Sequence, residues 1–126
     1  MTKMLIIAVD AMGGEKSPKK VIDGIIHHHQ KNNNIFYKIF GDQEIISKFI
    51  SNSLNKNNFE IIHTNEIVKD TDTPLAAAKR GKNTSMWMAI DSVKSKKSDV
   101  VISAGNTGAL FVIAKLNLKM IENIDK

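Results

Sequence analysis

Hydrophobic and polar positions along the chain define two kinds of apolar segment that alternate. Residues 4–9 form a short unbroken apolar run, as expected of a strand buried on both faces of a sheet. Residues 35–40, 59–64 and 99–103 are predicted to form three further strands. Between and after them, apolar residues recur at helical spacing. The alternation of strand and helix predicts an α/β domain with a mostly parallel sheet and flanking helices.

Capping residues mark several of the predicted helix ends. Ser17, followed by Pro18, predicts an N-cap with proline in the first turn. Asp42 is predicted to cap the second helix, and Gly81 is expected to divide the third helical stretch. Residues 106–123 predict a long last helix.

Length and composition are those of one globular domain, which we expect to span residues 1–126. The 126 residues are 42% hydrophobic and 25% charged, ordinary values for a soluble protein. There is no cysteine, which excludes disulfides and thiolate metal sites. No apolar run approaches the roughly 18 residues of a membrane span, and the first apolar run ends too soon for a secretory signal. A cytoplasmic location is expected.

The net charge of +5 favours anionic partners: phosphate compounds, an acidic carrier protein, nucleic acid or a lipid surface. Charge alone does not choose among them. Nucleic acid is not expected, because only the charge favours it: the chain has one tyrosine and no motif of basic and aromatic residues. Three consecutive histidines, residues 27–29, point in different directions on a helix, so they do not predict a metal site.

One candidate site is the stretch SAGNTGAL at residues 103–110. It follows a predicted strand, and ligands bind beyond the carboxyl ends of strands in open parallel sheets. Gly105 and Gly108 permit close backbone approach to a ligand, while Asn106 and Thr107 could cap the helix or donate to an oxyanion. Free amides at a helix start attract anions. Taken alone, the pattern fits a capped turn equally well.

A second candidate is the stretch VDAMGGE after the first predicted strand. Asp10 could hold a lysine, position a nucleophile, act as a base, or cap its own loop, and Gly13 and Gly14 leave room beside it. The stretch matches neither the dinucleotide fingerprint nor the phosphate loop of ATP-binding proteins, so it gives no motif for binding a nicotinamide cofactor or ATP.

A third candidate is the basic trio Lys79, Arg80 and Lys82, which precedes Thr84 and Ser85. Basic residues beside a helix start could clamp a phosphate, and an arginine can do so through two parallel hydrogen bonds. The alternative is a solvated basic face.

Together, the blocks IAVDAMGGEKSP, TPLAAAKRGKNTSM and SDVVISAGNTGAL resemble, in order and spacing, the N-terminal part of the PlsX family of acyl-ACP:phosphate acyltransferases. The resemblance implies a fold related to phosphotransacetylase and the isopropylmalate dehydrogenases. It implies transfer of a fatty acyl group from acyl carrier protein to inorganic phosphate, and use of the acyl phosphate by a glycerol-3-phosphate acyltransferase. No metal or organic cofactor is implied. A homodimer and peripheral membrane association are expected of the full-length family only.

The resemblance also carries over site residues by position. Asp10, as an orienting group, and Asn106 become catalytic candidates. The implied substrate-binding residues are Gly13, Gly14, Arg80, Lys82, Ser85, Ser103, Gly105, Asn106, Thr107 and Gly108. Lys79 stands where the family more often has arginine, and this exchange is not neutral if the position clamps phosphate with two bonds.

The resemblance covers the whole chain but only about the first third of the family's length. The alternative to an active acyltransferase is therefore a truncated, non-catalytic remnant, or one half of a split enzyme that at most binds phosphate or carrier protein. A fold reduced to this part is expected to expose apolar surface that the rest would cover.

Overall fold

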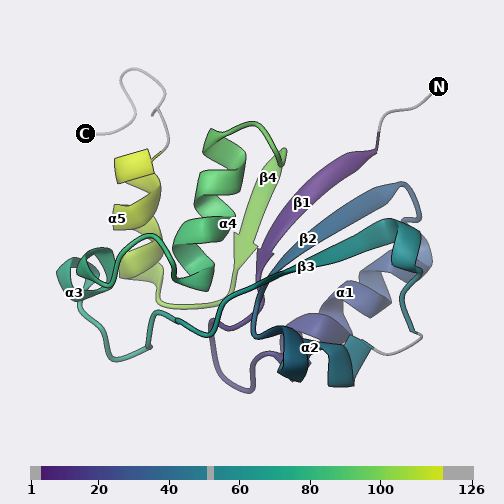
Figure 1. The fold of residues 1–126 in the computed structure, drawn as a ribbon, viewed down its shortest axis with the longest axis horizontal. Coiled ribbons are helices and arrows are strands. Elements are labelled where there is room, and N and C mark those ends of the chain that lie inside the picture. Colours follow the sequence, from purple (N-terminus) through teal and green to yellow (C-terminus); the bar gives the residue numbers. More distant parts are fainter. Residues whose placement is uncertain (1–3, 51–52, 118–126) are drawn as a thin grey trace.

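The computed structural model describes residues 4–50 and 53–117 and shows an α/β fold (Figure 1). Its four strands form a single sheet in which every pair is parallel, with the order β3-β2-β1-β4. The strands are β1 (Leu5–Asp10), β2 (Ile35–Gly41), β3 (Phe59–His63) and β4 (Val100–Ser103). The predicted fold class and all four predicted strands are confirmed.

Helices lie on both faces of the sheet (Figure 1). One face carries α1 (Lys19–Lys31) and α2 (Gln43–Ile50), and the other carries α4 (Ser85–Lys94) and α5 (Thr107–Asn117). The short α3 (Pro74–Lys79) packs against α5, and the 3-10 turn η1 (Lys56–Asn58) leads into β3. Among the described residues, no helix has the length and apolar character that a bilayer crossing requires.

The helix ends bear out two of the capping predictions and correct a third. The Asp42 carboxylate accepts from the amides of Glu44 at 3.0 Å and Ile45 at 3.3 Å, so it caps α2. Gly81, with φ +94°, separates α3 from α4. The Ser17 prediction is wrong: Pro18 is the N-cap of α1. The Ser17 hydroxyl instead donates to the carbonyl of Gly13, so it closes the preceding loop and is not available to the helix amides.

The last helix begins as predicted and is described as far as Asn117. The predicted continuation over residues 118–123 lies outside the described residues. The predicted start is confirmed by the Asn106 side chain, whose oxygen accepts from the amide of Ala109 at 3.0 Å.

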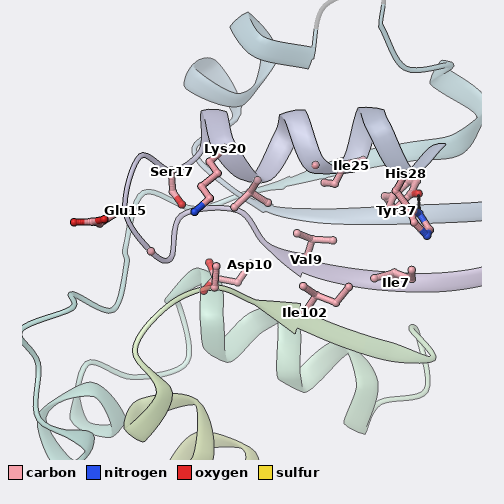
Figure 2. Close-up of a pocket in the computed structure, with 14 residues that line it drawn as sticks. Ile7, Val9, Asp10, Glu15, Ser17, Lys20, Ile25, His28, Tyr37 and Ile102 are labelled. Carbon is pink, nitrogen blue, oxygen red and sulfur yellow. Dashed lines mark hydrogen bonds between the residues drawn. The ribbon is translucent and has the colours of Figure 1, made fainter. Parts of the chain in front are cut away.

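Strand β4 has one face that α1 and α2 leave uncovered. Val100 and Ile102 are the register partners of Ile7 and Val9, and aligned residues of parallel strands point to the same side of the sheet. Ile7 and Val9 are buried beneath α1, whereas Val100 is 43% and Ile102 is 53% exposed. Figure 2 shows Ile102 across a cavity from α1. Strand β4 therefore exposes apolar side chains, as expected from the sequence for a fold reduced to this part.

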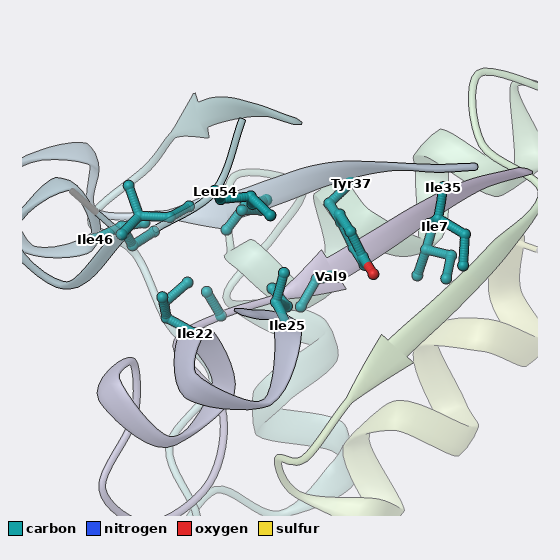
Figure 3. Packing of buried hydrophobic residues seen from close by; sticks show 11 residues of the cluster. Ile7, Val9, Ile22, Ile25, Ile35, Tyr37, Ile46 and Leu54 are labelled. Carbon is teal, nitrogen blue, oxygen red and sulfur yellow. The ribbon is translucent and has the colours of Figure 1, made fainter. Parts of the chain in front are cut away.

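The largest core cluster lies beneath α1 and α2 (Figure 3). Ile22 and Ile25 of α1 and Ile46 of α2 pack there on the side chains of β1 and β2, and Ile22, Ile39 and Ile46 are fully buried. A second cluster joins α3, α4 and α5 on the opposite face and includes Met86. A third cluster packs Ala89 of α4 on Ala8 of β1 and Phe40 of β2, so β1 and β2 lie between packed helices on both faces.

Candidate functional site

The strand order places a topological switch point between β1 and β4. From β1 the chain continues to β2 and β3 on one side, and then crosses to β4 on the other. Ligands of open α/β sheets bind in the crevice beyond the carboxyl ends of strands at such a point. Asp10 and Ser103 are the last residues of β1 and β4 and are direct register partners. Two of the three candidate stretches therefore meet at this edge.

Asp10 is the buried polar centre of the site. Its side chain is 2% exposed, and its Oδ1 accepts from the hydroxyl of Ser85 at 2.6 Å and the amide of Met12 at 3.1 Å. Its Oδ2 accepts from the hydroxyl of Ser103 at 2.9 Å. Asp10 therefore caps its own loop and also holds two hydroxyls from other elements. Hydrogen bonds of this kind offset the cost of removing a carboxylate from water.

Glycines bring the loops that follow β1 and β4 into direct backbone contact. A Cβ on Gly13 would lie 2.8 Å from Asp10 Oδ2 and 2.9 Å from the Cα of Gly105. Gly14 has φ +89°, and a Cβ there would lie 2.7 Å from the carbonyl oxygen of Ala104. The amide of Gly105 donates to Ser103 Oγ at 3.2 Å. Gly13, Gly14 and Gly105 thus allow the backbones of the two loops to pack against each other.

The N-terminus of α5 opens at the same edge, with Thr107 as its first residue. Asn106 ties it to the loop before α3, because its Nδ2 donates to the carbonyl oxygens of Asp72 at 2.6 Å and Lys69 at 3.3 Å. Gly108 lies against Pro74, where a Cβ would come within 2.9 Å of the ring. The first-turn amides of a helix have no partner within the helix, so they are suited to bind an anion.

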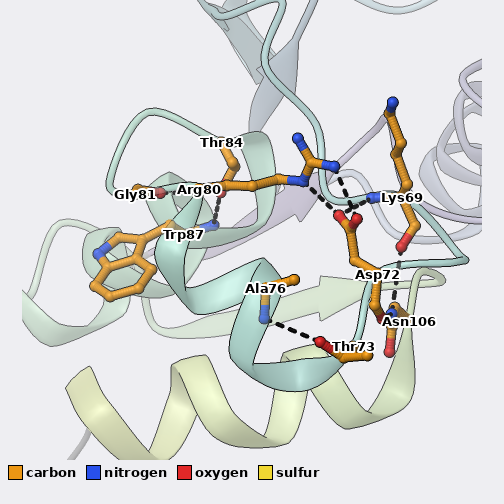
Figure 4. A network of polar contacts seen from close by, with 9 residues as sticks. All are labelled: Lys69, Asp72, Thr73, Ala76, Arg80, Gly81, Thr84, Trp87 and Asn106. Atoms are coloured by element: carbon orange, nitrogen blue, oxygen red, sulfur yellow. Dashed lines mark hydrogen bonds and ion pairs between the residues drawn. The ribbon is translucent and has the colours of Figure 1, made fainter.

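Arg80 joins this network through Asp72 (Figure 4). Its Nε and Nη2 donate to the two carboxylate oxygens of Asp72 at 2.5 Å and 2.8 Å. The hydrogen bonds from Arg80, followed by that from the Lys69 amide, lower the pKa of Asp72 to about 2. The two parallel bonds expected of Arg80 are therefore present, but to a carboxylate of the chain. The sequence interpretation missed Asp72, whose only signal was its place in the polar loop before Pro74.

Lys82 is not brought to the same place as Arg80. Arg80 lines a hollow with Lys69 and Thr84, whereas Lys82 lines another that lies against Lys38 and Phe40 of β2. Ser85, at the start of α4, points to Asp10. In the third candidate stretch, Ser85 therefore binds Asp10 directly. Arg80 is linked to the start of α5 through Asp72, whose carbonyl accepts from Asn106.

An apolar cavity of about 420 Å³ adjoins Asp10 on the α1 face of the sheet (Figure 2). Its far end holds a hydrogen bond of 2.6 Å between His28 Nδ1 and the hydroxyl of Tyr37. Burial raises the pKa of Tyr37, so this hydroxyl stays protonated at neutral pH. No group of histidine and carboxylate side chains suited to hold a metal ion occurs among residues 4–50 and 53–117.

Comparison with known proteins decides the family. A family model described as fatty acid synthesis protein matches residues 5–126. The chain is 70% identical over its whole length to the phosphate acyltransferase of Pelagibacter ubique, and covers 38% of that protein. It is 41% identical to the phosphate acyltransferase of Parvibaculum lavamentivorans over 100% of this chain and 36% of that one. The chain belongs to the PlsX family.

The chain corresponds to the N-terminal part of a PlsX protein. A match to the Lactobacillus gasseri phosphate acyltransferase, 38% identical, covers 95% of this chain and 36% of the relative. The chain thus spans little more than a third of the length of the PlsX proteins it matches. The family resemblance of the three sequence blocks is confirmed, and the fold agrees with the α/β architecture that it implied.

The Asp10 centre predicts a stability difference between two buried serines. Ser85→Ala removes a donor to a buried carboxylate, so we expect a loss of about 1.5–3 kcal/mol in unfolding free energy. The control is Ser98→Ala, which removes a neutral hydroxyl pair with Ser92 and should cost about 0.5–1.5 kcal/mol. Urea unfolding of both variants gives the comparison. Equal losses would mean that the hydrogen bond from Ser85 to the Asp10 carboxylate stabilises the fold no more than the neutral hydroxyl pair does.

The lowered pKa of Asp72 predicts an acid-dependent stability term. In the unfolded chain Asp72 takes up a proton below about pH 4, whereas in the folded chain its pKa is about 2. Between these values the unfolded state binds more protons, so this contribution falls as the pH falls. We expect Asp72→Asn to lack this component of the pH dependence in urea unfolding from pH 6 to about pH 2. Glu60→Gln, at the surface pair with Lys38, is the matched control; the same slope in Asp72→Asn and in the unsubstituted chain would refute the assignment.

Proposed function

We propose that the chain provides the phosphate-binding part of an acyltransferase that moves a fatty acyl group from acyl carrier protein to inorganic phosphate. The observation that carries the proposal is the meeting of the Asp10 loop with the start of α5 at the switch point between β1 and β4. Support also comes from the 70% identity to a phosphate acyltransferase along the whole chain.

The phosphate is proposed to bind at the start of α5. The amides of Asn106, Thr107 and Gly108 would donate to its oxygens, since the Gly105 amide donates to Ser103 Oγ. The positive end of the helix dipole favours the charge of the phosphate. Arg80 uses two of its N–H donors on Asp72, so of the five in a guanidinium three are left for a ligand. Asn106 holds the loop that carries Asp72 against the start of α5. Lys82 lines a separate hollow, which argues for a lesser part in this site.

In the proposed reaction, a phosphate oxygen attacks the carbonyl carbon of the acyl thioester. A C–O bond forms as the carbonyl electron pair moves to oxygen, and amides at the start of α5 would stabilise the resulting oxyanion. When the intermediate collapses, the C–S bond breaks and the electron pair leaves with the carrier-protein sulfur. The proton of hydrogen phosphate passes to that sulfur. The products are acyl phosphate and free carrier protein.

Asp10 is proposed to position groups in this reaction. Three donors occupy its carboxylate, and phosphate is already an anion at neutral pH, so the reaction does not depend on a strong base. Binding and orientation of the two reactants can supply much of the rate. Through Ser103 and its bond to the Gly105 amide, Asp10 would set the direction of the loop that leads into α5.

The second candidate function is binding without turnover, as a remnant or as half of a split enzyme. It is favoured by the coverage of the relatives, because the chain spans only 38% of the Pelagibacter ubique protein. In that case phosphate or carrier protein would bind at the same edge of the sheet, and acyl transfer would require residues from a second polypeptide. A cytoplasmic location and use of acyl phosphate by a glycerol-3-phosphate acyltransferase belong to the first candidate. So does a homodimer of the full-length form.

A chimera separates the two candidates. We would compare the chain alone with a fusion to the part of the Pelagibacter ubique relative that it does not match, and trap acyl phosphate with hydroxylamine after adding acyl carrier protein thioester and phosphate. We expect the fusion to form acyl phosphate, and Asn106→Ala in the fusion to lower the rate by about a hundredfold, as for loss of a group that orders oxyanion donors.

The control in the fusion is Gln30→Ala, an exposed position of α1, which should leave the rate unchanged. Acyl phosphate formed by the chain alone would exclude the non-catalytic candidate. A fusion that binds phosphate but forms no acyl phosphate would contradict the acyltransferase proposal.

A further inference from the structure

The apolar cavity beside Asp10 runs along one side of α1. Ser17, Lys20, Val21, Gly24 and His28 line it at helical spacing from one end to the other, and neighbours three and four apart share a helix face. Lys20 and His28 are eight positions apart, which corresponds to about 12 Å along a helix. The cavity is therefore an elongated groove, and its volume of about 420 Å³ falls within the range of small-molecule sites.

The floor and the opposite wall of the groove are aliphatic. Ile7 and Val9 of β1 form the floor, and Ile102 of β4 stands opposite α1 (Figure 2). Ile102 is 53% exposed, although its face of the sheet is buried elsewhere beneath α1. Burial of such a surface by an apolar ligand is favourable.

Gly24 leaves the α1 side of the groove open. It lies in the middle of α1, where glycine is the poorest helix former after proline. A Cβ at Gly24 would meet no atom within 4 Å, so no neighbour in the described structure prevents a side chain at this position. The glycine thus weakens the helix and leaves space in the groove.

The two ends of the groove differ in polarity. Asp10, Glu15, Ser17 and Lys20 lie at the end nearest the carboxyl edge. Figure 2 shows Lys20 directed toward that end and the Glu15 carboxylate pointing away from it. No carboxylate of residues 4–50 and 53–117 forms an ion pair with Lys20. At the other end the hydrogen bond between His28 and Tyr37 gives a partner to the Tyr37 hydroxyl and to His28 Nδ1. An apolar chain with an anionic or oxygen-bearing head fits this gradient.

We propose that this groove binds the aliphatic chain of the fatty acyl group, with the acyl oxygen end beside Lys20 at the carboxyl edge of the sheet. The inference rests on the proposed function, whose phosphate site opens at the same edge. The groove would place the acyl carbonyl near the loops after β1 and β4 and direct the chain back along α1 toward Tyr37. A polypeptide segment covering Ile102 is the competing occupant.

Binding of straight-chain fatty acids to the complete 126-residue chain tests the proposal. Dodecanoate is the probe, measured by isothermal titration below its micelle concentration, with octanoate for comparison. We expect tighter binding of dodecanoate, by at most about fourfold for each added methylene that becomes buried. Gly24→Leu fills the groove and should weaken dodecanoate binding at least tenfold. This substitution replaces a helical glycine, so the variant should unfold at no lower urea concentration.

Two matched controls separate the groove from general surface effects. Gln30→Leu adds the same side chain to an exposed position of α1 that does not line the groove, and it should bind dodecanoate as the unsubstituted chain does. Ile102→Asp should weaken binding at least tenfold, whereas Leu75→Asp, at a 64% exposed position on α3, should not. Absence of dodecanoate binding, or equal binding by all variants, would overturn the proposal in favour of a polypeptide cover.

This test is independent of the acyl transfer assay. Dodecanoate binding that follows the groove variants, together with a fusion that makes no acyl phosphate, would retain the groove and reject the proposed reaction. Acyl phosphate formation by the fusion, with no effect of Gly24→Leu on dodecanoyl transfer, would retain the reaction and reject the groove.

Discussion

A single buried carboxylate, that of Asp10, connects the parts of this molecule that meet at its candidate site. An ionised carboxylate removed from water is costly unless hydrogen bonds replace its hydration. Here the donors are the Met12 amide and the hydroxyls of Ser85 and Ser103, which are 75 and 93 positions away along the chain. The carboxylate is therefore satisfied only when β1, α4 and β4 are assembled together. Gly13 permits this arrangement, because a Cβ there would lie 2.8 Å from Asp10 Oδ2.

Much of the fold could be predicted from local pattern. The apolar runs gave the four strands, and the Asp42 cap and the break at Gly81 followed from side-chain chemistry and backbone freedom. The order β3-β2-β1-β4 could not be read from periodicity, since it depends on which strand edges pair in three dimensions. Ser17 shows the limit of capping rules: its hydroxyl donates to the Gly13 carbonyl, a contact that depends on the path of the loop.

The candidate site could be predicted in part, for a reason that lies in the topology. Parallel strands present their carboxyl ends at one edge, so polar stretches after two such strands converge when the strands are adjacent. Asp10 and Ser103 follow this rule. The pairing of Arg80 with Asp72 does not, because it joins a helix end to an irregular loop. The groove along α1 was also beyond local reasoning, since its floor, wall and opening come from β1, β4 and Gly24. Membership of the PlsX family explains why the three sequence blocks occur together in one chain.

Inorganic phosphate is proposed to bind where the Asp10 loop meets the start of α5. The most direct measurement is a phosphate titration of the ¹⁵N-labelled chain followed by amide NMR at constant ionic strength, with chloride as the reference anion. We expect saturable shifts concentrated at residues 10–14 and 103–109, and smaller shifts when Asn106 is replaced by alanine. Shifts that do not saturate, or that fall on exposed lysines of α1 and not on this edge, would contradict it.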